Sequence, residues 1–356
     1  IATTLINVFG RKNVKWAVCL TGFIVGIALF YEIGFVLLIP LVFTIAAEAK
    51  IPLLEVGIPM AAALSVTHGF LPPHPGPTAI AIIYNADIGV TLVYGAIIAI
   101  PTAIVAGPVF YNFTKGINPE IPKGLYNPKI FEDHEMPGFG VSVFTALVPV
   151  VLMAASAIAK LALDQSSPVA VVLEFLGQPD MALTISVAIA VYTFGLARGK
   201  KMDEIMNTVK DAILAIAMIL LIVGAGGALK QILIDSGVGT YIGTLVADAS
   251  LSPLVLAWLV AAVIRTACGS ATVAALTAGG IAAPICAATG ANPELMVLAT
   301  GAGSLIFSPP NDPGFWLFKE FFGLTVKETV RTWCALETII AIMGLIGVLV
   351  LNTVVA

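Results

Sequence analysis

The sequence predicts an all-α, polytopic membrane protein with an inverted-topology repeat, two re-entrant hairpins and two broken transmembrane helices. The first reason is composition: 59% of the 356 residues are hydrophobic and 11% are charged, whereas soluble domains carry about 25% charged residues. The second reason is that apolar runs of roughly twenty residues, long enough to cross a hydrocarbon core, recur along the chain. The third reason is a repeated order of helix breaks rich in proline and glycine.

Apolar blocks and helix breakers divide the chain into two repeats. The first repeat, residues 1–111, contains a hairpin over 15–47, a broken helix over 52–86 and a helix over 90–111. Because the sequence opens on an isoleucine rather than a methionine, we expect this repeat to be truncated at its N-terminus.

A polar segment over 112–139 is predicted to be a cytoplasmic loop, and the second repeat follows over 140–356. This repeat contains helices over 140–162, 181–197 and 210–229, a hairpin over 251–288, a broken helix over 293–320 and a helix over 332–352. Residues 238–249 are expected to form a short interfacial segment.

The basic residues support this topology. If each hairpin enters and leaves the membrane on one side, fourteen of the seventeen Lys and Arg residues lie on one face, and Lys160, Lys230 and Arg265 do not. Because cytoplasmic segments carry an excess of Lys and Arg, that face is predicted to be cytoplasmic. If a single span replaced either hairpin, the Lys and Arg residues would be distributed over both faces of the membrane.

Two stretches of the chain carry their breaks in the same order, although few of their residues are identical. The corresponding positions are Gly34 and Gly269, Pro52 and Pro293, Pro72-Pro73 and Pro309-Pro310, Gly76 and Gly314, and Gly89 and Gly323. Together with the charge distribution, this order predicts that the two copies enter the membrane from opposite sides. Inverted repeats of this kind are typical of secondary transporters, which bind substrate and coupling ion between paired helix breaks.

The breaks themselves indicate a polar site within the membrane. Proline lacks an amide hydrogen and interrupts the helical ladder, and freed carbonyl groups are tolerated at membrane depth only inside protein or beside a cavity. We expect "THGFLPPHPGPTAIA" (residues 67–81) and "SPPNDPG" (residues 308–314) to meet there. The hairpin tips "YEIG" (residues 31–34) and "RTACGS" (residues 265–270) are expected beside them.

Four residues are candidates for proton coupling. Glu32 lies at the first hairpin tip, and an intramembrane carboxylate is by default a functional hypothesis; the alternative is an interfacial or structurally paired group. His68 and His74 flank the first break and titrate near neutral pH, although a histidine in an apolar stretch is more often structural. Asp312 competes with Glu32 for the proton, or caps the helix that begins at Pro313.

Substrate binding is predicted to involve residues of the second tip and of both breaks. Arg265 is suited to a bidentate grip on a carboxylate, or to permanent pairing with Glu32 or Asp312. The remaining candidates offer amide or hydroxyl groups, namely Gly269, Ser270, Thr272, Thr67, Thr78 and Asn311. Their alternatives are close helix packing for the small residues and bonding back to the helix for the threonines.

Other classes of function receive no support from the sequence. A net charge of −4 argues against a nucleic-acid partner, and no metal site, cofactor or catalytic residue is predicted. The four cysteines are expected to be small core residues. An intramembrane hydrolase is disfavoured because His68 and His74 lack the HExxH spacing and no GxSxG is present.

Glu337, near the start of the last helix, is expected at the membrane interface.

Four segments resemble the gluconate permease (gluconate:proton symporter) family over essentially the whole chain. They read "VTHGFLPPHPGPTAIA", "FYEIGFVLLIPLVFTIAA", "RTACGSATVAALTAGGIAAP" and "NDPGFWLFKEFFGLTVKETVRTW". The resemblance implies proton-coupled import of gluconate or a related hydroxy acid across a bacterial inner membrane. Some relatives carry D-serine, and sodium coupling is the alternative. The wider group of ion transporters has two hairpins and two broken helices, and homodimers are common in it.

The sequence departs from this family in two respects. Family members are longer at the N-terminus by a few helices. Their second break reads approximately Ser-His-Val-Asn-Asp, whereas this chain has Ser308-Pro309-Pro310-Asn311-Asp312. A proline therefore replaces a histidine beside the expected site.

Overall fold

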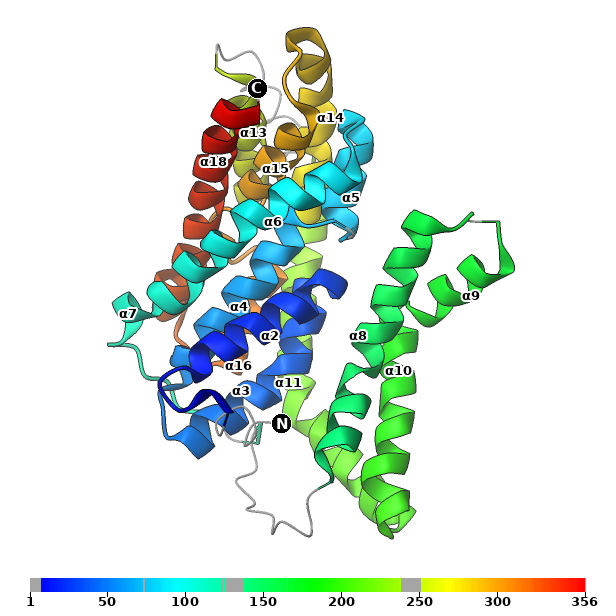
Figure 1. Ribbon diagram of the computed structural model, residues 1–356. Coiled ribbons are helices and arrows are strands. Elements are labelled where there is room, and N and C mark those ends of the chain that lie inside the picture. Colours follow the sequence, from blue (N-terminus) through cyan, green and yellow to red (C-terminus); the bar gives the residue numbers. More distant parts are fainter. Residues whose placement is uncertain are drawn as a thin grey trace.

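The structure is a computed structural model that describes residues 8–355 except 73, 123, 126–136, 165 and 238–250. Within these residues every regular element is a helix (Figure 1), which confirms the all-α prediction. Six helical segments are long and apolar enough to cross a membrane, namely Tyr31–Ala49, Leu53–Phe70, Ile88–Thr114, Asp180–Arg198, Ala271–Thr289 and Val326–Val355. The segment over 238–249, expected to be interfacial, lies outside the described residues.

The first hairpin consists of α2 (Val14–Ala28) and α3 (Tyr31–Ala49). Its break comes just before "YEIG" rather than within it, so Glu32 lies in the first turn of α3. The reason is local: Phe30 is extended, with φ −57° and ψ 150°, and its carbonyl accepts the Gly34 amide at 2.9 Å. Gly34 allows close packing, because a Cβ there would lie 2.7 Å from Leu64 Cδ2.

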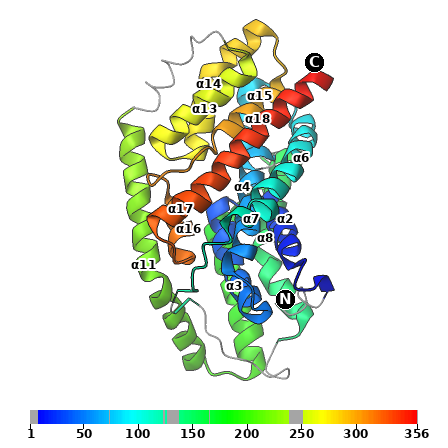
Figure 2. The ribbon, with the colours of Figure 1, turned by 90° about the vertical axis from the view of Figure 1, so that its left-hand side faces the viewer.

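The second hairpin consists of α13 (Pro253–Cys268) and α14 (Ala271–Thr289). Gly269 ends α13 with φ +68°, and the Ser270 hydroxyl caps α14 by accepting the Val273 amide. Figures 1 and 2 show α2 and α3 in the lower half of the molecule and α13 and α14 in the upper half. The two hairpins therefore extend from opposite ends toward the middle.

Each broken helix resumes on a proline. The first is formed by α4 (Leu53–Phe70) and α5 (Pro75–Tyr84), the second by α15 (Pro293–Gly303) and α16 (Pro313–Phe321). Pro75 and Pro313 occupy the first turn, where the missing amide hydrogen would have had no helical partner. Nearly all of α4 is buried, so the first break lies deep inside the molecule.

Two long helices complete the central bundle. The first, α6 (Ile88–Ile104), continues through the π-helical η1 (Val105–Val109) to α7 (Tyr111–Thr114). The second, α18 (Ala335–Val355), follows α17 (Val326–Thr329) and the π-helical η4 (Val330–Cys334), and packs against α15 and α6. Such π-helical turns occur frequently at functional sites.

A peripheral group of helices lies at the right of Figure 1. It contains α8 (Phe139–Ala162), α9 (Pro168–Leu176), and α10 (Pro179–Ala190) with η2 (Val191–Gly195) and η3 (Leu196–Arg198). The sequence analysis did not predict α9, although Ser167 as its cap and a proline in its first turn are recognisable start signals. Many large apolar side chains of this group are exposed, including Phe144 and Ile158.

The helix predicted over 210–229 is longer in the structure, where α11 spans Met202–Asp235. The prediction followed the apolar run and excluded its polar first turns. Asp203 and Glu204 lie in the first turn, where acidic side chains stabilise a helix through its dipole. The described part of α11 contacts α13 and α16.

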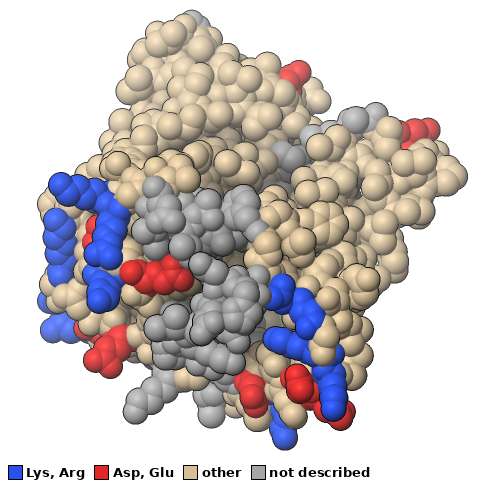
Figure 3. All heavy atoms as spheres, turned by 60° about the horizontal axis from the view of Figure 1, so that its bottom comes forward, with Lys and Arg blue, Asp and Glu red and all other residues tan. Residues whose placement is uncertain are grey.

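Lys and Arg side chains gather around one end of the molecule. Figure 3 shows this end, which lies at the bottom of Figure 1, while the adjoining surface in that view carries few charges. The C-terminal end of α3 and the connection to α11 lie there. The one-sided placement of Lys and Arg across a membrane stays a prediction.

We expect Gly269→Ala to destabilise the protein more than Gly290→Ala. Both glycines end a helix with positive φ, +68° and +66°, and the left-handed conformation costs a residue with a Cβ about 1–2 kcal/mol. A Cβ at Gly269 would also lie 2.3 Å from the Asn311 carbonyl oxygen, whereas one at Gly290 would meet nothing within 4 Å. Thermal unfolding of the purified variants measures the difference, and equal losses would contradict this packing of the tip.

Candidate functional site

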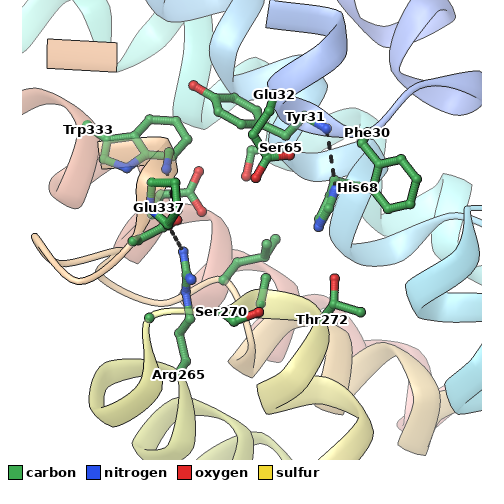
Figure 4. A pocket seen from close by; sticks show the side chains of 16 residues that line it. Phe30, Tyr31, Glu32, Ser65, His68, Arg265, Ser270, Thr272, Trp333 and Glu337 are labelled. Atoms are coloured by element: carbon green, nitrogen blue, oxygen red, sulfur yellow. Dashed lines mark hydrogen bonds and ion pairs between the residues drawn. The ribbon is translucent and has the colours of Figure 1, made fainter. Parts of the chain in front are cut away.

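A polar cavity of about 110 Å³ lies where the hairpin tips meet. Its walls come from α3, α4, the second hairpin tip, the second break and the region from η4 to α18 (Figure 4). The lining residues are Phe30, Tyr31, Glu32, Ser65, His68, Arg265, Gly269, Ser270, Ala271, Thr272, Leu305, Asp312, Pro313, Gly314, Trp333 and Glu337. Two larger hollows, lined by Ile97 and by Trp258 among others, have no charged lining residue within the described parts of the chain.

Arg265 and Asp312 form a buried ion pair in the wall of this cavity. Arg265 is 3% exposed and Asp312 is 6% exposed, and an Arg265 Nη2 hydrogen bond reaches an Asp312 oxygen. The same carboxylate accepts bonds from the Ser308 hydroxyl and the Gly314 amide. The cap expected of Asp312 is therefore observed, and so is the pairing given as an alternative for Arg265. The proton-coupling role of Asp312 stays a prediction.

The arginine keeps one donor free among the described residues. Its Nε is buried and has no hydrogen-bond partner there. A planar guanidinium offers donors in a fixed fork that matches the two oxygens of a carboxylate. Because Arg265 lines the cavity, its guanidinium lies beside any anion that enters it.

The second break is tied to the tip of the second hairpin. Asn311 Nδ2 donates to the carbonyl oxygens of Thr266 and Ala267, at 3.2 and 3.0 Å. Trp333 Nε1 donates to Ser308 Oγ at 2.6 Å. These bonds hold the break against the cavity wall from two directions.

The backbone of this break is strained immediately before its prolines. Phe307 and Ser308 have φ of 63° and 35°, a region that side chains with a Cβ rarely adopt. Strain of this kind clusters at binding sites. Pro309 and Pro310 do not line the cavity, and their carbonyls accept the Asp312 amide and Trp316 Nε1. The proline substitution noted in the sequence therefore shapes the turn rather than the cavity wall.

Short polar groups of the second tip face the opposite wall. Figure 4 shows Ser270 and Thr272 on the side of Arg265, with Glu32, Ser65 and His68 across the cavity. The cavity thus combines one guanidinium with hydroxyl groups, and the first residues of α14 and α16 line it. Such a set can bind a small acid that also carries hydroxyl groups.

The two glutamates of the cavity differ in burial. Glu32 lines it with an exposed side chain, in contrast to the expected buried carboxylate. Glu337 is 1% exposed, so its expected interfacial position is wrong. The sequence carried a usable signal, because Glu337 lies in an apolar helix and an intramembrane carboxylate is a candidate by default. Ser65, Tyr31 and Trp333 were also missed, and isolated residues of these types carry no such signal.

The structure places the two histidines together but gives them different surroundings. His68 lines the cavity, and its Nδ1 accepts the Tyr31 amide at 3.4 Å. His74 is 2% exposed and does not line it. The ring centroids are 4.4 Å apart, and Phe30 packs on His74 at 4.7 Å. Among the described residues, neither ring nitrogen of His74 has a hydrogen-bond partner.

Three predicted binding residues lie outside the cavity lining. Thr67 is fully buried, and its hydroxyl donates back to the carbonyls of Ala63 and Leu64. Thr78 Oγ1 is buried without a partner among the described residues. Asn311 binds the tip backbone instead. The cavity brings together Glu32, His68, Arg265, Gly269, Ser270, Thr272 and Asp312 from the predicted set.

Comparison with known proteins identifies the family to which these features belong. The pattern that describes GntP family permeases matches residues 1–354. The chain belongs to the GntP permease family. It is therefore a membrane transport protein and not an enzyme, and the resemblance seen in the sequence is confirmed.

Relatives of this GntP permease include transporters of sugar acids. It is 63% identical over 355 residues to the high-affinity gluconate transporter of Escherichia coli (strain K12), a match that covers 100% of this chain and 81% of that protein. It is 56% identical over 354 residues to the Gnt-II system L-idonate transporter of the same strain (99% and 81%). It is 51% identical over 365 residues to the gluconate permease of Bacillus subtilis (strain 168) (100% and 82%). No solved structure matches the chain.

Proposed function

We propose that this permease imports gluconate or a closely related sugar acid by proton symport across a bacterial inner membrane. The observation that carries the proposal is the buried Arg265 with an unused Nε donor, placed in a cavity lined by hydroxyl groups. The relatives named for gluconate and L-idonate transport indicate the same substrate class.

The carboxylate of the substrate binds Arg265 in this proposal. A charge-assisted hydrogen bond to a carboxylate is roughly twice as strong as a neutral one. Asp312 holds Nη2 in place, so the fork is oriented before the substrate arrives. Ionised acids without a cationic partner would be too costly to bring into the cavity.

The polyol part of the substrate binds the short polar groups around the tips. Ser270 and Thr272 lie beside the arginine, and Ser65 and His68 lie across from them. Hydroxyl groups donate and accept hydrogen bonds, so they match the consecutive hydroxyls along a sugar-acid chain. An unsubstituted fatty acid would leave these groups unpaired, which disfavours it.

The helix arrangement supports an alternating-access transporter. We propose that α2 with α3 and α13 with α14 are re-entrant hairpins of two inverted repeats, residues 1–111 and 140–356, with 112–139 cytoplasmic. Both hairpin tips contribute to one cavity, and the hairpins extend from opposite ends. Substrate sites of inverted-repeat transporters lie at such a repeat interface.

Uptake of labelled gluconate into proteoliposomes tests this proposal. An inward proton gradient without sodium should drive accumulation, and a sodium gradient at equal pH should not. Accumulation that requires sodium would overturn the proton assignment and leave the transporter assignment intact. No gluconate uptake or exchange under either gradient would overturn the substrate assignment.

A further inference from the structure

We infer that Glu337, on α18, carries the proton that is transported together with the sugar acid. The inference rests on the proposed function and deepens it, because it assigns the coupling step to one carboxyl.

Asp312 is fully engaged as an anion. Arg265, the Ser308 hydroxyl and the Gly314 amide all donate to it. These three donors commit the carboxylate to holding the arginine and the start of α16. Protonation of Asp312 would weaken these bonds and release α16 from its cap, so it is poorly suited to bind and release a proton in each cycle.

Glu32 has a different environment, because its side chain is exposed. Where water fills the cavity, it screens an exposed carboxylate from an anion that binds at Arg265. Proton binding at Glu32 would be coupled only weakly to substrate.

Glu337 combines burial with a missing partner. It is 1% exposed and lines the cavity, and within the described residues its Oε1 has no hydrogen-bond partner. A buried carboxylate with one oxygen left without a donor is costly to keep charged in a dry interior. The charged and titratable groups that face it are Arg265, Asp312, Glu32, Tyr31, Cys334 and His68. The Ser65 hydroxyl from α4 reaches its carboxyl.

Charge counting then links the proton to the substrate. One guanidinium faces three carboxyls in the cavity, so a substrate anion adds a fourth negative group beside a single cation. A proton on Glu337 removes one of these charges without disturbing the Arg265 pair. In the inward step, a proton from outside binds the Glu337 carboxylate and the anion binds Arg265. Both leave on the inner side, and the carboxylate is restored.

The histidines are less suited to this role. His68 Nδ1 accepts the Tyr31 amide, so this nitrogen must stay unprotonated to keep the bond. His74 does not line the cavity. A proton on His68 Nδ1 would break the bond to the Tyr31 amide, and His74 is not in contact with the cavity. Both rings are therefore poor sites for proton exchange with the cavity.

Glu337→Gln in the full-length protein, reconstituted in liposomes, tests the inference. One proton per univalent anion supports about tenfold accumulation of gluconate per unit of pH gradient. The variant should still exchange internal for external gluconate, while its accumulation ratio should fall to about one, since no protonation step remains to couple. Glu204→Gln, at an exposed position in the first turn of α11, is the matched control and should accumulate like wild type.

Ser65→Ala supplies a second readout that keeps the Glu337 carboxyl. Without the Ser65 hydroxyl, the charged carboxylate loses a donor, so uptake should persist to higher pH than in wild type. Accumulation by Glu337→Gln would overturn the inference, and so would an unchanged pH profile of Ser65→Ala. If Glu337→Gln also loses gluconate exchange, the pH profile of uptake by Ser65→Ala decides whether the inference holds. Absence of uptake and exchange in wild type would refute the proposed function instead.

Discussion

Arg265→Ala is expected to abolish gluconate uptake and to destabilise the protein. The substitution removes the proposed carboxylate ligand and leaves Asp312 as an uncompensated buried charge. Breaking a buried ion pair by removing one partner costs about 3–5 kcal/mol. Uptake in proteoliposomes and thermal unfolding in detergent measure the two effects. Uptake comparable to wild type would contradict the binding role of Arg265.

A double variant separates the binding role from the structural one. Arg265→Met with Asp312→Asn removes both charges, and asparagine still caps α16. Apolar or neutral replacement of a buried pair is often close to neutral in stability, so this variant should recover most of the stability lost in Arg265→Ala. It should still not transport gluconate. Recovery of transport together with stability would show that the arginine serves structure alone.

Trp333→Ala is expected to give the second large effect, a loss of about 3–5 kcal/mol of stability, because it empties a packed position. Trp333 is 2% exposed, and its ring lies 4.8 Å from Tyr31 and 5.3 Å from Phe318, measured between centroids. The substitution also removes a wall of the cavity. Unfolding of the purified variant in detergent is the measurement.

Two controls accompany this variant. Trp333→Phe keeps an aromatic ring but loses the bond to Ser308, and a typical hydrogen bond contributes about 1 kcal/mol. Trp16→Ala removes a side chain that is 41% exposed, and surface substitutions usually stay within about 0.5 kcal/mol. A loss at Trp333→Ala no larger than at Trp16→Ala would contradict the packed wall.

The architecture was largely predictable because its signals are local. Long apolar runs and clustered prolines predict the helices and their interruptions, and the structure shows helices on both sides of each break. Start signals are equally local, as Pro313 after Asp312 illustrates. Helix α9 was not expected from the sequence, and α11 was expected to be shorter than it is. Both errors arise because hydrophobicity alone does not mark helix ends, which depend on capping and dipole signals.

The site was less predictable because its geometry depends on contacts between distant segments. The sequence indicated Arg265, Asp312 and Glu32 as charges in apolar surroundings and left open which carboxylate pairs with the arginine. The structure pairs Asp312 with it, while Glu32 is exposed. The depth of the Glu337 side chain depends on how α18 packs against the bundle. Its position near the start of an apolar helix alone therefore suggested the interface. Thr67 illustrates the opposite error: proximity to a break does not place a side chain in the cavity.

The central claim is that the substrate carboxylate binds Arg265 between the hairpin tips. A cryo-electron microscopy structure of the full-length permease with bound gluconate tests it most directly. The carboxylate should lie within hydrogen-bonding distance of Arg265 Nε, with the hydroxyl chain against Ser270 and Thr272. Gluconate bound away from Arg265, or in a cavity to which the two tips do not contribute, would contradict the claim.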